Sequence, residues 1–234
     1  MTFPINEVKF EQLFPNRNAV FSYSALTAAA HKYPDFLNKG SETDKLHELI
    51  AFLANVSHET TGGWAGAPGG TYAWGLYFAQ EVGCEQGQCT QYSQQNEHYP
   101  PVPNETYQGR GALQLSWNYN YGMASEAIFG DASVLLNAPD RVATESTLAW
   151  QTAIWFWMTA QSPKPSCHAV MVGDGSQYDG DRFGETVNII NGGIECGRGM
   201  NPQLENRIGF YKHFCDLLGA DAPENLGSYC ANCR

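Results

Sequence analysis

The segment 148–160 limits the possible folds more than any other part of the chain. It is apolar around most of a helix circumference and carries the large side chains of Trp150, Ile154, Trp155, Phe156 and Trp157. A helix with apolar residues on every face is normally buried on all sides. Other elements must therefore surround this segment, and we expect it to be the central helix of a sizeable core.

A second helix is predicted over residues 44–56, where apolar residues recur at helical spacing. Ser41 and Asp44 are placed to form a capping box, in which each side chain bonds the backbone amide of the other residue. The helix runs directly into SHETTGGW at residues 57–64. We therefore expect Glu59 at or just beyond its end.

Two more helices are predicted, over residues 24–33 and 204–218. Pro34 ends the first, because proline clashes with the preceding helical turn. Gly219 supplies a stop for the second.

The segments between these helices are rich in glycine and proline and show little of the alternation that marks strands. They cover residues 62–75, 99–111, 173–184 and 191–202. The sequence thus predicts a mainly α-helical fold with long loops. It contains no internal repeat and no linker-like change of composition, so we expect residues 1–234 to form a single domain.

The charge of the chain argues against several kinds of partner. It has 13 Lys and Arg against 24 Asp and Glu, a net charge of −11, and no basic cluster. Clustered cations supply most of the affinity for nucleic acid phosphates, so we expect no nucleic acid partner, and an anionic membrane surface is disfavoured for the same reason. No apolar run approaches the roughly 20 residues of a membrane helix. We expect a soluble monomer.

Two glutamates are candidates for catalysis. Glu59 lies beside glycines that permit a close approach, and Glu81 ends the aromatic segment TYAWGLYFAQE at residues 71–81. Two carboxylates opposed across a groove lined by Tyr and Trp are the minimum equipment for glycoside hydrolysis. One protonates the leaving oxygen and the other handles water or the sugar. Taken alone, Glu59 could also be a solvated glutamate at a helix end, and most pairs of glutamates have no catalytic role.

A metal site is not indicated here. His58 and Glu59 do not begin the zinc-protease motif HExxH, because Gly62 occupies its fifth position. We expect neither a metal nor another cofactor.

The segment YQGRGALQLSWNYNYG at residues 107–122 suits a sugar ligand. Neutral donors and acceptors such as Gln114, Ser116 and Asn120 alternate there with flat rings, and sugars need both hydrogen bonds and stacking surfaces. The alternative is a turn whose asparagines cap a helix beginning near Tyr119. Both interpretations can hold together.

The segments SHETTGGW, TYAWGLYFAQE and YQGRGALQLSWNYNYG resemble the signature regions of glycoside hydrolase family 19, the chitinases of plants and bacteria. Further matches follow in the same order: LFPNRN at Leu13, AIWFWMTAQSPKPSCHAV from Ala153, NIINGGIECGRG from Asn188 and NRIGFYKHFC from Asn206. The resemblance covers nearly the whole chain. It implies a mainly α, two-lobed, lysozyme-like fold with long loops around a cleft for chitin, the β-1,4 polymer of N-acetylglucosamine.

The resemblance also implies roles for individual residues. Glu59 matches the general acid of the family, Glu81 the general base, and Ser116 the residue that helps to hold the attacking water. Asn120 matches the asparagine that binds the N-acetyl group, and Arg207 the arginine that supports the catalytic carboxylates. The other residues expected to contact sugar are His58, Thr61, Trp64, Trp74, Gln114, Tyr119, Lys164 and Asn191.

The cysteine positions that match the family imply two disulfides. One is a local bridge between Cys84 and Cys89, and the other joins Cys196 to Cys230 or Cys233, with Cys230 as our choice. The alternative is a zinc site made by the Cys-x4-Cys pair together with the terminal Cys-x2-Cys pair.

The chain departs from the plant pattern in several places. Leu76 and Tyr77 stand where many plant members have a cysteine, and the segment 84–106 resembles plant sequences only weakly. We find no cysteine-rich chitin-binding module before the catalytic region.

The sequence therefore predicts an endo-acting, inverting chitinase that acts on chitin and its oligosaccharides. One alternative is a peptidoglycan-cleaving lysozyme or endolysin. Another is a catalytically silent chitin-binding antifungal protein, which would not need both glutamates and Ser116. The cysteine pattern favours an oxidising compartment, so we expect a secreted protein, although no signal peptide is visible.

Overall fold

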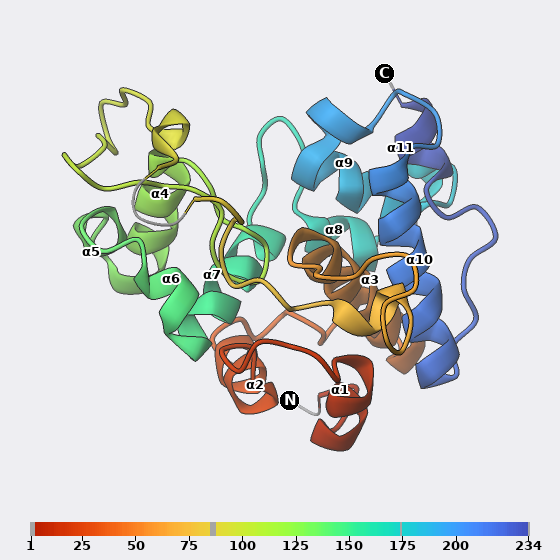
Figure 1. The fold of residues 1–234 in the computed structure, drawn as a ribbon. Coiled ribbons are helices and arrows are strands. Elements are labelled where there is room, and N and C mark those ends of the chain that lie inside the picture. The colour runs from red at the N-terminus through yellow and green to blue at the C-terminus, as the bar shows by residue number, and fades with distance from the viewer. Residues whose placement is uncertain (1–2, 85–87, 174, 234) are drawn as a thin grey trace.

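The structure is a computed structural model that describes residues 3–84, 88–173 and 175–233 (Figure 1). Strand pairing within these residues is limited to isolated β-bridges, and the predicted mainly α-helical fold with long loops is confirmed. No helix in the described part of the chain combines the length and the apolar character needed to cross a membrane. The helices, including the short 3-10 helices η1, η3 and η4, are α1 Glu7–Leu13, α2 Tyr23–Ala30, α3 Glu42–Glu59, η1 Thr71–Trp74, η3 Thr90–Tyr92, α4 Asn118–Phe129, α5 Ser133–Leu136, α6 Arg141–Thr144, α7 Ser146–Met158, α8 Cys167–Val172, η4 Ser176–Tyr178, α9 Arg182–Glu195, α10 Pro202–Leu218 and α11 Ser228–Asn232.

Two hydrophobic cores divide the described residues into lobes. The larger core draws on α1, α2, α3 and α7 to α11, and the smaller on α4, α5 and α6. Figure 1 shows α4 to α6 on one side of the molecule and α3 with α8 to α11 on the other. Helix α7 contributes to both cores, with Trp150 and Trp157 in the larger and Trp155 in the smaller. The apolar segment is therefore the central helix, as predicted.

Helix α3 carries the first candidate glutamate. The predicted capping box forms at its start, where the Ser41 hydroxyl accepts from the Asp44 amide at 3.2 Å and the Asp44 carboxylate accepts from the Ser41 amide at 2.9 Å. The helix ends at Glu59, after which Thr60 leaves the helical conformation. The Thr60 hydroxyl accepts a hydrogen bond from the amide of Leu76 at 2.9 Å. This bond fixes the loop that follows the glutamate.

The predicted helices exist, and their boundaries differ by a few residues. Helix α3 extends beyond 44–56 at both ends, and α2 ends at Ala30 because residues 31 and 32 already form a turn. Helix α7 starts two residues before 148. Helix α10 ends at Leu218, and Gly219 takes the left-handed φ of 70° that stops it.

Helix α9 overlaps two segments that the sequence analysis assigns to loops, and that assignment is wrong for residues 182–184 and 191–195. Gly184, Gly192 and Gly193 weaken the helical pattern. The helix forms because Asp181 caps it, accepting from the Gly184 amide at 2.9 Å, and because it packs against α8 and α11. Asn191, with φ −143°, interrupts the helix just before its last turn.

Candidate active site

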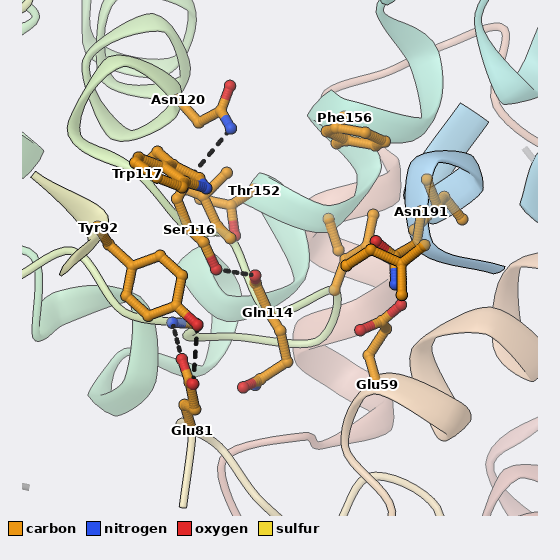
Figure 2. A pocket seen from close by; sticks show the side chains of 16 residues that line it. Glu59, Glu81, Tyr92, Gln114, Ser116, Trp117, Asn120, Thr152, Phe156 and Asn191 are labelled. Carbon is orange, nitrogen blue, oxygen red and sulfur yellow. Dashed lines mark hydrogen bonds between the residues drawn. The ribbon is translucent and has the colours of Figure 1, made fainter. Parts of the chain in front are cut away.

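A cavity of about 460 Å³ is lined by residues from both lobes. Figure 2 shows Glu59 and Asn191 on one wall, facing Glu81, Tyr92 and Ser116 on the other. Six of the predicted site residues line this cavity: Glu59, Glu81, Gln114, Ser116, Asn120 and Asn191.

Glu59 is 19% exposed and bonds a buried arginine from α10. Its Oε1 accepts from Nη2 of Arg207 at 2.5 Å. Arg207 also donates from Nε and Nη2 to the two oxygens of Glu195, at 2.9 and 2.7 Å, and from Nη1 to Asn55 at 3.0 Å. Burial lowers the pKa of Arg207, but the two carboxylates outweigh this effect and hold its pKa above the ordinary value. Arg207 is therefore a fixed positive charge behind Glu59.

Glu195 is the second carboxylate on this arginine, and it is 1% exposed. Its Oε1 also accepts from the Asn191 side chain at 2.8 Å. Burial raises the pKa of Glu195, but the hydrogen bonds and charge of Arg207 outweigh burial and hold the pKa below its ordinary value. Glu195 is not among the residues predicted from the sequence. Its position four residues after Asn191, in the motif NIINGGIECGRG, is the signal that could have found it.

His58 does not line the cavity and lies next to Asn206, whose side-chain oxygen is 2.8 Å from Nδ1. Burial, followed by the charge of Arg207, lowers the pKa of His58, so the imidazole is neutral at pH 7. Because an amide oxygen only accepts, Nδ1 carries the proton. His58 thus anchors the end of α3 to α10.

Glu81 is half-buried and is held at both of its oxygens (Figure 2). Oε2 accepts from the backbone amide of Gly109 at 3.2 Å, and Oε1 accepts from the hydroxyl of Tyr92 at 2.8 Å. Burial, followed by the bond to Glu81, raises the pKa of Tyr92 to about 12, so the phenol remains a donor at neutral pH. The partners of Glu81 are neutral, whereas Glu59 faces a guanidinium.

Ser116 is flanked by two residues with left-handed backbone, Gln114 with φ 51° and Trp117 with φ 74°. Non-glycine residues keep such conformations only where the surrounding structure enforces them. The Ser116 hydroxyl donates to the Gln114 carbonyl at 2.9 Å, and the Asn120 side chain donates to the Ser116 carbonyl at 2.9 Å. The result is a tight turn that presents three neutral polar side chains to one cavity.

Helix α4 begins at Asn118, close to the predicted start at Tyr119. The prediction that asparagines cap it is wrong, because Trp117 occupies the N-cap position and makes no side-chain cap bond. Asn118 instead accepts from the Gln94 amide at 2.8 Å and donates to the Tyr99 carbonyl at 2.6 Å. It ties the segment before the site to α4.

Two predicted sugar-binding tryptophans lie outside the cavity, Trp64 on the loop after α3 and Trp74 at the end of η1. The rings of Trp64 and Trp74 are 5.2 Å apart, and Trp64 is 52% exposed. On the same loop, the Thr61 hydroxyl accepts from the Gly63 amide at 3.0 Å. This loop joins the two candidate glutamates along the chain.

The two remaining predicted residues, Tyr119 and Lys164, also lie outside the cavity lining. Tyr119 stacks on Trp117 with ring centroids 6.0 Å apart. Lys164 donates to the Asn188 carbonyl on α9 at 2.5 Å.

The structure contains the two disulfides Cys84–Cys89 and Cys196–Cys230. The zinc alternative required the thiols of Cys84, Cys89 and Cys230, so it is wrong. The free cysteines are Cys167, Cys215 and Cys233.

Comparison with known proteins places the chain in a family. Residues 5–228 match the family described as class I chitinases. An endochitinase of Persea americana is 45% identical over 239 residues, which cover 96% of this chain and 71% of the relative. Chitinase 3 of Oryza sativa subsp. japonica is 44% identical over 234 residues, which cover 94% of this chain and 71% of the relative.

Solved structures are similar over nearly the whole chain. Chitinase C from Streptomyces griseus HUT6037 has a TM-score of 0.77 at 36% identity, covering 96% of this chain and 97% of that one. A family 19, class IV chitinase from Zea mays has a TM-score of 0.70 at 30% identity, covering 96% and 98%. The chain therefore belongs to glycoside hydrolase family 19, a family of chitinases, and has the mainly α-helical fold of that family.

Proposed function

We propose that this chain is an endo-acting chitinase that hydrolyses β-1,4 linkages between N-acetylglucosamine units by a single displacement with inversion. Membership of the chitinase family supports the substrate, and the endochitinase among its relatives supports endo action. The observation that carries the assignment of roles is that Glu59 and Glu81 line one cavity and have different partners.

Glu59 is the general acid and Glu81 the general base. Glu59 gives its proton to the glycosidic oxygen as the bond from that oxygen to the anomeric carbon breaks. Glu81 takes a proton from a water molecule whose oxygen bonds the same carbon from the opposite face. The transfer leaves Glu59 anionic, and the positive charge of Arg207 stabilises that state.

The neutral side chains of the turn before α4 hold the other reactants. The Ser116 hydroxyl lies on the same wall as Glu81 and can accept a hydrogen bond from the attacking water (Figure 2). Asn120 binds the N-acetyl group, and Gln114 and Asn191 bind sugar hydroxyls across the cavity. The exposed ring of Trp64, with Trp74 beside it, extends the binding surface beyond the cavity by stacking on further sugars.

We expect His58, Thr61, Tyr119 and Lys164, which lie outside the cavity lining, to contribute sugar contacts to the same binding region. The protein acts as a secreted monomer without a nucleic acid or membrane partner. Two disulfides support an oxidising compartment, and the net charge of −11 argues against anionic partners.

Two variants test the roles. Glu59→Gln removes the transferable proton and Glu81→Gln removes the base, so each lowers kcat on chitin oligosaccharides by at least about 100-fold, while oligosaccharide binding stays measurable. Glu126→Gln is the matched control, because Glu126 accepts a tyrosine hydroxyl, as Glu81 does, but does not line the cavity. A rate above about a tenth of wild type in either active-site variant contradicts its role.

A further inference from the structure

Tyr92 lines the cavity and has no role in the mechanism proposed above. Within the described residues, it is the only side chain that hydrogen-bonds Glu81, with its hydroxyl 2.8 Å from Oε1. The Gly109 amide holds the other oxygen at 3.2 Å. A glutamate side chain has several rotatable bonds, and two donors of fixed position select one orientation of its carboxylate.

The turn that carries Tyr92 is too short to hold its own position. Helix η3 has three residues, Thr90–Tyr92, and no side-chain cap. Two contacts fix it from outside. The disulfide of Cys89, the residue before the turn, reaches back to Cys84, and the Tyr92 ring packs edge-on against Trp117 with centroids 5.5 Å apart.

The same disulfide is connected to the backbone around Glu81. Cys84 lies three residues after Glu81, and its amide donates to the Glu81 carbonyl at 3.4 Å. The Cys84 carbonyl accepts from the buried side chain of Gln108, next to Gly109, at 3.1 Å. Both donors to the Glu81 carboxylate are thus attached to one cross-linked unit.

We propose that Tyr92 is a positioning residue that orients the general base Glu81, and that the Cys84–Cys89 disulfide holds Tyr92 in place. This inference rests on the proposed role of Glu81. The phenol does not exchange protons with the substrate, since burial and the bond to Glu81 keep it protonated with a pKa of about 12. It keeps the carboxylate directed at the attacking water, where a displacement of about 1 Å costs roughly 100-fold in rate.

The test compares Tyr92→Phe with Tyr99→Phe. Both substitutions remove a hydroxyl that donates to a carboxylate, since Tyr99 donates to Glu126 at 2.6 Å, but only Tyr92 bonds a residue of the cavity. Tyr92→Phe lowers kcat on chitin oligosaccharides by about 10-fold or more, with KM within about 2-fold. Tyr99→Phe keeps wild-type kcat. A Tyr92→Phe enzyme with more than about half the wild-type kcat, or with only KM changed, overturns the proposal.

The double variant separates this inference from the proposed function. If Tyr92 acts through Glu81, Glu81→Gln/Tyr92→Phe has the same residual rate as Glu81→Gln. A further fall in the double variant means that Tyr92 has another role and overturns the inference alone. An active Glu81→Gln enzyme overturns the role of Glu81 and the inference together.

The disulfide is tested with Cys84→Ala/Cys89→Ala, after thermal melting has shown that the variant folds. We expect the loss of the bridge to lower kcat as Tyr92→Phe does. Combining it with Tyr92→Phe should cause no further loss, because both changes remove the hydrogen bond from Tyr92 to Glu81. Wild-type kcat without the bridge, or an additive loss in the combined variant, overturns the part assigned to the disulfide. If the variant does not fold, the same comparison is made with the single substitution Cys89→Ser, which also removes the bridge, in wild type and in Tyr92→Phe.

Discussion

At the scale of single residues, the site depends on one arginine shared between two carboxylates. Arg207 contacts Glu195 with a two-pronged pair of hydrogen bonds and reaches Glu59 with the same Nη2. A planar guanidinium fits this geometry, and an ammonium does not. Glu195 therefore fixes the orientation of the guanidinium, which bonds Glu59 in the cavity lining.

Glu195 also makes the stability of the protein depend on acid pH. Its pKa is lowered on folding, so its ionised form contributes stability above its unfolded pKa of about 4.3, and this contribution is lost as the pH falls through the lower folded pKa. We expect the melting temperature of the wild type to fall more steeply below about pH 4.5 than that of Glu195→Gln. Calorimetry on both proteins between about pH 3 and pH 7 measures this. Parallel curves would show that Glu195 is not the titrating group.

The cavity residues could be predicted from motifs, but of their partners only Arg207 was expected, and only from the family resemblance. Glu59, Glu81 and Ser116 lie in segments whose composition already suits sugar chemistry. The bond from Arg207 to Glu59 joins residues 148 positions apart, and no local spacing reveals it. Tyr92 could not be predicted for a different reason, because it lies in the segment 84–106, which resembles plant sequences only weakly.

At the scale of elements, the close approach of α10 to η1 depends on a glycine. A Cβ at Gly209 would lie 1.9 Å from the hydroxyl oxygen of Tyr72. Tyr72 cannot easily yield, since its ring packs against Phe210 at 5.0 Å and His213 at 5.9 Å. This contact sets the position of η1, which ends at Trp74.

We expect Gly209→Ala to destabilise the protein by about 1–3 kcal/mol, because the clash exceeds the gain of roughly 0.5–1 kcal/mol that alanine brings to a helix. Gly193→Ala in α9 is the matched control, since a Cβ there meets nothing within 4 Å. Chemical denaturation compares the two. Equal stability of both variants would contradict the packing described for η1.

Long helices could be predicted because their periodicity is strong. In α3 and α10, apolar residues recur at helical spacing, and α7 is apolar around most of its circumference. Each of these helices has at least 13 residues. Helix α9 could not, because its glycines and the break at Asn191 remove the pattern. It forms through its cap at Asp181 and its contacts with α8 and α11, which are tertiary effects.

At the scale of the whole molecule, the negative charge of the protein favours chitin over peptidoglycan as the substrate. Of the described residues that line the cavity, two are carboxylates and none is Lys or Arg. The nearby cations Arg110 and Arg207 are buried and paired with carboxylates, and Lys164 lies outside the cavity lining, where it bonds Asn188. The cavity lining itself therefore carries no cation to offset the net charge of −11. Peptidoglycan carries anionic peptides, and chitin is essentially uncharged.

We expect faster initial rates on soluble chitin than on purified peptidoglycan at physiological salt. The reason is that the anionic protein and the anionic peptidoglycan repel each other. Raising the ionic strength should narrow the difference, since salt screens the repulsion. Side-by-side rates at several salt concentrations measure this. Faster cleavage of peptidoglycan would reject chitin as the preferred substrate and leave the two glutamates in place.

The stereochemistry of the product shows whether hydrolysis proceeds by a single displacement. A water activated by Glu81 on one face of the sugar, while Glu59 protonates the leaving oxygen on the other, inverts the anomeric carbon in one step. NMR of a chitin oligosaccharide digest, sampled faster than mutarotation, reads the configuration of the new reducing end. We expect α-anomers as the first products, and a dominant β-anomer would exclude the single displacement by Glu59 and Glu81.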